Sequence, residues 1–217
     1  YYFQSATVAD MMRFYRGFYP AFDTARYERF KEVFAIPEKA VIRRLSKGMQ
    51  KQAAFWLTMC CRPRYLILDE PVDGLDPVMR RQVWSIMMSD VAEHGTTVLV
   101  SSHNLRELED VCDHVGIMNK GKVLIERSLN DLQENIVKLQ AVWKPGEAPV
   151  LPKELEVLHI SHVGRVYTYI VRGKAAEVTA RLEPCGPLML EALPLSLEEI
   201  FIYELGGEQY AVKEIIL

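Results

Sequence analysis

The stretch YLILDEPVDGLDP, residues 65–77, decides the fold expected for this chain. Its first four residues are apolar, and the acidic pair Asp69 and Glu70 follows them directly. A short apolar run that ends abruptly in acids is typical of a fully buried parallel β-strand with polar side chains at its carboxyl end. Ligands of open α/β sheets bind beyond the carboxyl ends of the strands, so we expect the chemistry of the protein around this acidic pair.

A second strand of the same kind follows farther along the chain. Residues 96–100 are predicted to form another buried strand, and the polar residues 101–103, Ser-Ser-His, come directly after it. Between the two strands a helix is expected from Val78 to about residue 93, ended by His94-Gly95. The alternation of strand and helix predicts an α/β sheet.

The first third of the chain is predicted to be helical. One helix is expected to begin after Thr7 and to stop at Pro20, and a second is expected to begin at Asp23. The sequence LSKGMQ, residues 45–50, precedes a third helix that runs to about Cys61. A serine, a glycine and a helix N-terminus together can bind an anion, although the same residues also suit an ordinary helix start.

The remainder of the chain is predicted to contain a short helix, a hairpin and a separate α+β unit. The expected elements are a helix at 104–112, hairpin strands at 115–118 and 122–126, strands at 139–143, 156–161 and 165–171, and a helix at 175–182.

Composition limits the functions that the chain can have. Of its 217 residues, 49% are hydrophobic and 25% are charged, as in a globular protein, and the formal net charge of −3 does not favour a nucleic-acid binder. No apolar stretch reaches the roughly 18–20 residues that a membrane-spanning helix needs, so we expect any membrane role to come through a partner. The four cysteines lack zinc spacing and are expected to be reduced.

Three polar side chains are candidates for phosphate chemistry. Of the two adjacent acids, one can hold Mg²⁺ and the other can orient and polarise an attacking water. His103, at the end of the next strand, could contact a terminal phosphate. Each residue taken alone also fits a structural role, as a helix cap, an ion-pair partner or an exposed residue at a helix start.

Taken in order, these motifs resemble those of the ATP-binding-cassette (ABC) ATPase family. The resemblance covers about residues 5–130, and several motifs in the same order are far more specific than any one of them. The matching segments are 45–50 for the signature motif, 65–71 for the Walker B strand, 74–77 for the D-loop, 102–103 for the switch histidine and 121–123 for the turn that closes the cassette.

The resemblance implies a P-loop NTPase-like fold and the catalytic roles of three residues. Asp69 would position Mg²⁺, Glu70 would act as the base toward water, and His103 would brace the γ-phosphate of ATP. The transition state of phosphoryl transfer needs little covalent help, so positioning and charge would dominate catalysis.

The resemblance also implies a dimer. Two ATPase subunits would pair head to tail and enclose two ATP molecules, with Ser46, Lys47, Gly48 and Gln50 contacting the nucleotide held by the opposite subunit. Asp76 would belong to the same nucleotide interface and couple the two sites. Closure on ATP and release on hydrolysis would drive transmembrane permease subunits, to which residues 7–34 should be adjacent.

One family motif does not occur in these residues. The sequence Gly-x-x-x-x-Gly-Lys-Ser/Thr, which cradles phosphates, is absent from the 217 residues, so we interpret them as the carboxyl-terminal part of an ABC subunit without the Walker A strand and helix. The strands at 65–68 and 96–100 would then lack a neighbour. We expect either a segment outside these residues or an oligomer or swapped dimer to cover the exposed surface.

We therefore expect an incomplete P-loop NTPase-like α/β core with a helical signature subdomain and a small α+β extension. The expected divisions are 1–62 for the helical subdomain, 63–135 for part of the catalytic core with Walker B, the D-loop and the switch histidine, and 136–217 for the extension.

The expected function is that of the ATP-binding and ATP-hydrolysing subunit of a bacterial ABC transporter, in particular an exporter. It would lie in the cytoplasm at the inner face of the membrane, and these residues alone would hydrolyse ATP poorly or not at all. The alternatives are a regulatory or assembly fragment without catalysis, which the absent phosphate loop favours and the intact Glu70 opposes, and a soluble ABC protein not linked to transport. Long coiled coils, a second cassette or a basic linker would indicate the soluble protein, and none is present.

Overall fold

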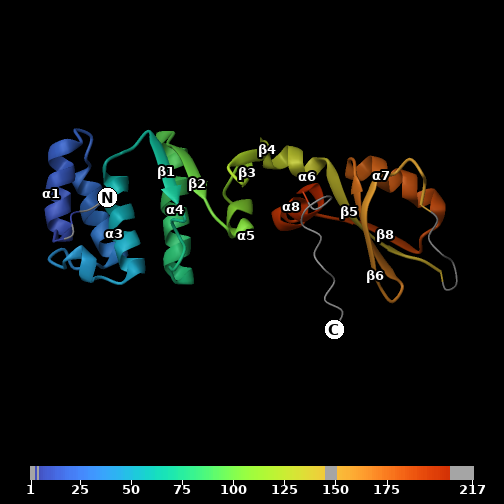
Figure 1. Cartoon of the computed structure of the whole chain (residues 1–217), viewed down its shortest axis with the longest axis horizontal. Coiled ribbons are helices and arrows are strands. Elements are labelled where there is room, and N and C mark those ends of the chain that lie inside the picture. Colours follow the sequence, from blue (N-terminus) through green and yellow to red (C-terminus); the bar gives the residue numbers. More distant parts are fainter. Residues whose placement is uncertain (1–2, 4, 145–150, 206–217) are drawn as a thin grey trace. The chain divides into compact units, whose positions relative to one another are not determined.

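The computed structural model describes residues 3, 5–144 and 151–205, and the chain divides into two compact units, 1–103 and 104–217 (Figure 1). The division into parts at 62/63 and 135/136 stays a prediction. The first unit contains α1 (Val8–Phe18), α2 (Thr24–Phe34), the 3₁₀ turn η1 (Ile42–Arg44), α3 (Lys47–Cys60), β1 (Tyr65–Asp69), α4 (Pro77–His94) and β2 (Thr97–Ser101).

The expected helix starts are confirmed by their caps. The Thr7 hydroxyl accepts a hydrogen bond from the Asp10 N–H at 3.1 Å, and the Asp10 carboxylate accepts one from the Thr7 N–H at 3.0 Å, which completes a capping box for α1. The Asp23 carboxylate accepts from the Arg26 N–H at 2.8 Å at the start of α2. Gly95 ends α4 in the left-handed conformation, at φ 65°.

Aromatic side chains fill the core of the helical part. Trp56 on α3 is 0% exposed, and its ring stacks on that of Tyr27 from α2 at a centroid distance of 4.6 Å. The indole N–H donates to the Tyr27 carbonyl at 3.1 Å, so the one polar atom of the buried ring is satisfied. Phe34 packs against the same ring. These contacts hold α2 against α3.

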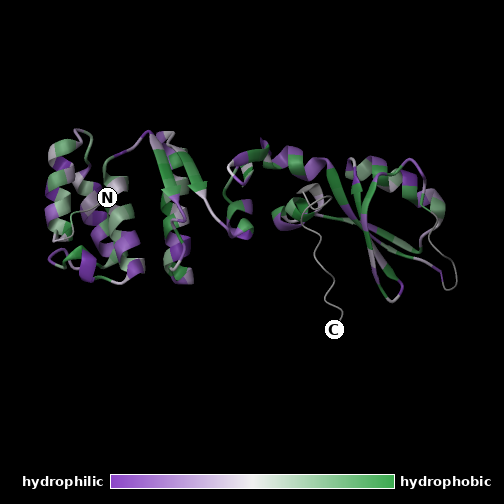
Figure 2. Cartoon of the chain, in the orientation of Figure 1, coloured by the Kyte–Doolittle hydropathy of each residue, from purple (hydrophilic) through white to green (hydrophobic). Residues whose placement is uncertain are grey.

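The strands β1 and β2 pair in parallel, as expected, with Asp69 opposite Ser101 at their carboxyl ends. The expectation that both strands are fully buried is wrong for the described residues. Leu66 is 3% exposed, but Ile67 is 76% exposed and its register partner Leu99 is 65% exposed. Alternate side chains of a strand point to opposite faces, and no described element covers the second face although it is hydrophobic (Figure 2).

The second unit begins with the short helix α5, followed by the expected hairpin and an antiparallel sheet of order β6-β7-β5-β8, against which α7 packs (Figure 1). Its elements are α5 (Leu105–Glu109), β3 (His114–Asn119), β4 (Lys122–Ser128), α6 (Leu129–Glu134), β5 (Ile136–Val142), β6 (Val157–Val163), β7 (Val166–Arg172), α7 (Ala175–Leu182), the 3₁₀ turn η2 (Glu183–Cys185), β8 (Met189–Leu193) and α8 (Leu197–Leu205).

The small α+β unit was expected, with two differences in detail. The helix predicted at 104–112 is shorter, Leu105–Glu109, and the elements α6 and β8 were not predicted. The core of this sheet is built on Leu139 and Tyr169, both 0% exposed, and the Trp143 indole N–H donates to the Tyr169 hydroxyl at 2.9 Å.

Candidate functional site

The two parallel strands bring the predicted catalytic residues to one edge of the first unit. The Ser101 hydroxyl at the end of β2 donates to a carboxylate oxygen of Asp69 at 2.5 Å, and the Glu70 backbone N–H donates to the same hydroxyl at 3.0 Å and to the Ser101 carbonyl at 3.2 Å. Ser101 therefore fixes both acids relative to β2.

Glu70 lies in the left-handed backbone region, with φ 46°. This conformation costs a non-glycine residue roughly 1–2 kcal/mol, and it persists only where the surroundings hold it. Here the Glu70 N–H bonds to β2, and the Glu70 carbonyl accepts a hydrogen bond from the Lys51 ammonium of α3 at 3.0 Å. The chain therefore turns sharply directly after the strand.

His103 is the partner of the Glu70 carboxylate. Its ring Nδ1 lies 2.9 Å from Glu70 Oε2, and the side chains are 73% and 33% exposed, respectively. Because a carboxylate only accepts hydrogen bonds, Nδ1 carries the proton in this contact. Two residues that are 33 positions apart in the sequence thus meet at the carboxyl ends of adjacent strands.

Lys51 ties α3 to the acidic turn after β1. In addition to the Glu70 carbonyl, its ammonium donates to the Asp73 carbonyl at 2.7 Å and lies 3.4 Å from an Asp73 carboxylate oxygen. One side chain of α3 thus contacts both ends of the turn that follows β1. The sequence did not predict this residue, since a lysine in the second turn of a helix carries no signal of such contacts.

The residues that resemble the signature motif sit at the start of α3. The Ser46 hydroxyl caps the helix by accepting from the Met49 N–H at 3.2 Å, and the Gln50 amide folds back to donate to the Leu45 carbonyl at 2.8 Å. A Cβ atom on Gly48 would lie 3.2 Å from the Gly74 carbonyl oxygen. Gly48 therefore allows the first turn of α3 to lie close to the turn that precedes α4.

The two remaining predicted residues are Lys47, which precedes Gly48, and Asp76, which follows Gly74 in the sequence. Lys47 is exposed and makes no hydrogen bond or ion pair within the described part of the chain. Asp76 caps α4, because one of its carboxylate oxygens accepts from the Val78 and Met79 N–H groups at 3.0 Å each. The structure therefore brings Glu70 and His103 into direct contact, with Asp69 next to Glu70 in the chain and bonded to Ser101. The nucleotide-binding roles of Ser46, Lys47, Gly48, Gln50 and Asp76 stay predictions.

The oxygen atoms of this site suit Mg²⁺, but further ligands would be needed to hold the ion. Mg²⁺ takes oxygen ligands and is commonly held by one or two carboxylates together with phosphates and water. Asp69 is exposed and has the Ser101 hydroxyl beside it, so hard oxygen donors are in place. No group of three or more His, Cys, Asp or Glu side chains in the described residues is placed to hold a metal ion.

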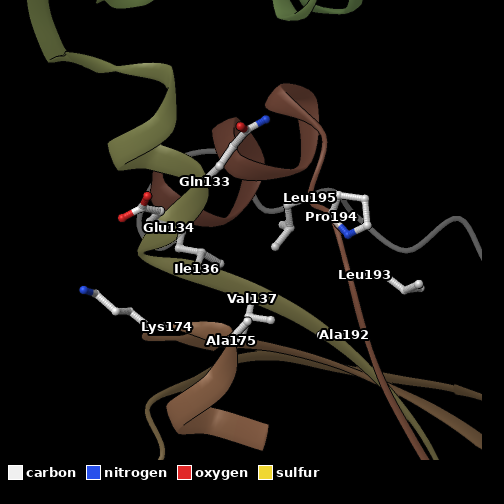
Figure 3. A pocket seen from close by; sticks show the side chains of 10 residues that line it. All are labelled: Gln133, Glu134, Ile136, Val137, Lys174, Ala175, Ala192, Leu193, Pro194 and Leu195. Carbon is white, nitrogen blue, oxygen red and sulfur yellow. The ribbon is translucent and has the colours of Figure 1, made fainter.

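A separate hollow of about 420 Å³ lies in the second unit (Figure 3). It is lined by the buried apolar side chains Ile136, Val137 and Leu195 and, among polar residues, by Lys174 and Glu134. None of the predicted site residues lines it. We assign it no part in the chemistry of the acidic pair.

None of the helices formed by the described residues has the length and apolar character needed to cross a membrane.

Comparison with known proteins identifies the relatives of the chain, although no protein-family model matches it. The chain is 29% identical over 208 residues to the ABC transporter ATP-binding protein YtrB of Bacillus subtilis, a match that covers 96% of this chain and 71% of YtrB. It is 30% identical over 169 residues to the Nod factor export ATP-binding protein I of Neorhizobium galegae, which covers 76% of this chain and 48% of the relative.

A solved structure shows the same relationship. The structure of an ATP-binding subunit of an ABC transporter is 25% identical, with a TM-score of 0.55 over 61% of this chain and 57% of that one. The chain thus spans about half the length of the Nod factor relative and of the solved subunit. Over most of its length the chain is a homologue of ABC transporter ATP-binding proteins, and its structural neighbours are ABC ATPase domains.

Proposed function

We propose that the chain acts in the ATP-hydrolysing subunit of a bacterial ABC transporter, with Glu70 as the catalytic base. The observation that carries this proposal is the 2.9 Å contact between Glu70 and His103 at the ends of two parallel strands, beside Asp69. A base must be held at the place where the proton is taken up, and Glu70 is held through its backbone and its carboxylate.

In this proposal Glu70 accepts a proton from the water that attacks the γ-phosphate of ATP. His103 donates its Nδ1–H to the carboxylate and so fixes its direction, and by family resemblance it also contacts the γ-phosphate. Asp69, assisted by Ser101, would hold Mg²⁺. When bound, Mg²⁺ would supply positive charge that neutralises the phosphate oxygens.

The signature residues would act on the nucleotide of a second subunit. Ser46 and Gly48 stand at the N-terminus of a 14-residue helix, where backbone N–H groups and the helix dipole favour an anion. Lys51, on the same helix, bonds to the turn after Glu70. In a head-to-tail dimer this link would couple the signature residues of a subunit to its own catalytic turn, and Asp76 would serve the same interface.

An exposed aromatic surface on α1 supports a permease partner. Phe14, Phe18 and Tyr19 are 44%, 68% and 39% exposed, and their rings contact one another along one side of the helix end. Exposed apolar patches of this kind mark interaction sites, and aromatic side chains are enriched in interface cores. We place the transmembrane permease on this surface, which puts the subunit at the cytoplasmic face of the membrane. The Nod factor export relative favours export.

The 217 residues contain no Gly-x-x-x-x-Gly-Lys-Ser/Thr loop. In this proposal that loop comes from a segment or chain outside these residues, and the 217 residues by themselves hydrolyse ATP slowly or not at all. The same observation supports a second candidate, in which the chain only supplies its signature residues to another cassette and Glu70 performs no chemistry.

Complementation between two variants tests the proposal. Ser46→Arg and Glu70→Gln are each introduced into a polypeptide that joins these residues to the upstream phosphate-binding segment of an ABC ATPase. Each variant alone should be inactive. In a head-to-tail dimer the mixed pair keeps one intact site, so random mixing should restore about a quarter of the activity.

The matched control is Glu32→Gln, which changes an exposed carboxylate on α2 and should leave turnover unchanged. If mixing restores nothing, the arrangement of Ser46 and Glu70 in trans is refuted. If Glu70→Gln alone stays active, the second candidate holds.

A further inference from the structure

The chain around the start of α3 is basic and contains no acidic residue. Between residues 39 and 68 there are seven lysines and arginines and no aspartate or glutamate, although the whole chain has a formal net charge of −3. Three of these seven side chains are engaged within the first unit. Lys51 bonds to the turn after β1, and Arg62 pairs with Asp23. The Arg64 guanidinium lies over the Tyr65 ring.

The other four side chains form a basic cluster. They are exposed, make no hydrogen bond or ion pair within the described residues, and lie within nine consecutive residues that include η1: Lys39, Arg43, Arg44 and Lys47. Glu38 beside them is engaged elsewhere, because its carboxylate accepts from the Tyr27 hydroxyl at 2.9 Å and pairs with Lys31. The same holds for Asp10 of the neighbouring α1, which pairs with Arg13 at 2.7 Å. Even if Glu38 is counted against the cluster, three of its four positive charges stay unbalanced.

The helix that follows adds to this positive field. α3 is 14 residues long and begins at Lys47, so the positive end of its dipole lies beside the cluster. Charges of one sign that gather on one surface attract a partner of the opposite sign. The triphosphate of ATP, a compact polyanion, meets this requirement.

The same chain carries the complementary charge. Residues 69–76 contain four acidic side chains and no basic one: Asp69, Glu70, Asp73 and Asp76. Lys51 offsets one of these charges, at Asp73. In the proposed head-to-tail dimer the start of α3 in one subunit faces the ATP and the catalytic acids of the other. The basic cluster of each subunit would thus meet a surface of opposite charge, twice in every symmetric dimer.

We infer that the basic cluster is a docking surface for the ATP-loaded face of a second copy of this subunit, an inference that rests on the proposed function. Arg43 and Arg44 are residues that it adds to the nucleotide interface. They draw the triphosphate toward the helix start at Ser46 and Gly48, where backbone N–H groups favour an anion. Charges at the rim of an interface act mainly on the rate of encounter and on its salt dependence.

ATP-driven dimer formation at several salt concentrations tests this inference. The parent is the polypeptide that joins these residues to an upstream phosphate-binding segment, with Glu70→Gln to prevent turnover, and sedimentation velocity gives the dimer dissociation constant. Arg43→Gln together with Arg44→Gln should weaken the dimer about tenfold, because each dimer loses four exposed charges. The difference should appear at about 0.1 M salt and shrink to less than about twofold at about 1 M, since salt screens exposed charges. Arg43→Lys together with Arg44→Lys keeps the charge and should stay within about twofold of the parent.

Arg29→Gln together with Arg81→Gln is the matched control, because it makes the same change in charge at exposed positions of α2 and α4 outside the cluster and should leave the dimer unchanged. Equal weakening by the two Gln pairs would show a response to total charge alone and would overturn the inference. A dimer of the Arg43 and Arg44 variant as tight as the parent's would overturn it too, while ATP-driven pairing keeps the proposed function intact.

Two further outcomes count against the inference. If the parent does not pair with ATP at all, the proposed function is refuted and the inference with it. If the parent binds phosphatidylserine vesicles, and the Arg43 and Arg44 variant loses this binding without any change in the dimer, the cluster receives a lipid surface and the inference is wrong.

Discussion

Replacing Lys51 by Met should loosen the link between α3 and the turn that follows β1. The Lys51 ammonium donates to the Glu70 carbonyl at 3.0 Å and to the Asp73 carbonyl at 2.7 Å. Methionine keeps most of the apolar stem and its packing but cannot make these hydrogen bonds. The change therefore isolates the polar contacts of a single side chain.

The expected cost follows from those two hydrogen bonds. A hydrogen bond that involves a charged group contributes about 1.5–3 kcal/mol. The Lys51 side chain is 36% exposed, so water replaces part of what is lost, and its 3.4 Å ion pair with Asp73 adds little. We expect the free energy of unfolding of the first unit to fall by about 2 kcal/mol, which lowers its melting temperature by about 8 °C.

Urea unfolding followed by tryptophan fluorescence measures this change, since Trp56 and Trp84 both lie in the first unit. Lys47→Met is the matched control, because Lys47 is exposed on the same helix and makes no contact of this kind in the described residues. A loss of less than 0.5 kcal/mol in Lys51→Met, or an equal loss in Lys47→Met, would refute the role assigned to this link.

Three further changes test the fold and its exposed face. Trp56→Ala removes a fully buried ring and should lower the free energy of unfolding by about 3–5 kcal/mol; a loss below 1 kcal/mol in urea would contradict this. The pKa of Asp23 is lowered by the Arg26 N–H and, despite partial burial, by Arg62, so its stabilisation is present above the ordinary carboxyl range and is lost as pH falls through the lowered value. Asp23→Asn should therefore cost about 1–2 kcal/mol at pH 7 and almost nothing near pH 2, and a deficit that persists in acid would be inconsistent with this. Ile67→Lys should reduce association of the 217-residue chain in sedimentation velocity runs, because Ile67 lies on the uncovered face of β1, and unchanged association would exclude that face as the contact.

Local signals in the sequence predicted most of the elements. Thr7 and Asp23 predicted the starts of α1 and α2, and Gly95 predicted the end of α4, because capping and left-handed turns depend on residues close in the sequence. The helix at 175–182 was predicted to the residue. Strand β8 was missed because its sequence, MLEAL, has little β-propensity and becomes a strand only by pairing with β5.

The candidate site was predicted in part. Asp69, Glu70 and His103 could be placed together because parallel strands bring their carboxyl ends to one edge. The roles of Ser101 and Lys51 depend on side-chain contacts between segments 19 to 32 residues apart, for which a single sequence carries no periodic signal. The prediction that β1 is fully buried was wrong. Its side chains alternate between two faces, and a face is buried only where another element covers the sheet.

The most direct test is ATP turnover by Glu70→Gln in the polypeptide that joins these residues to a phosphate-binding segment. If Glu70 is the base, the steady-state rate should fall at least about 100-fold, while ATP still drives dimer formation in the ultracentrifuge. Turnover within a few-fold of the wild-type rate, with the dimer intact, would contradict the assignment of Glu70.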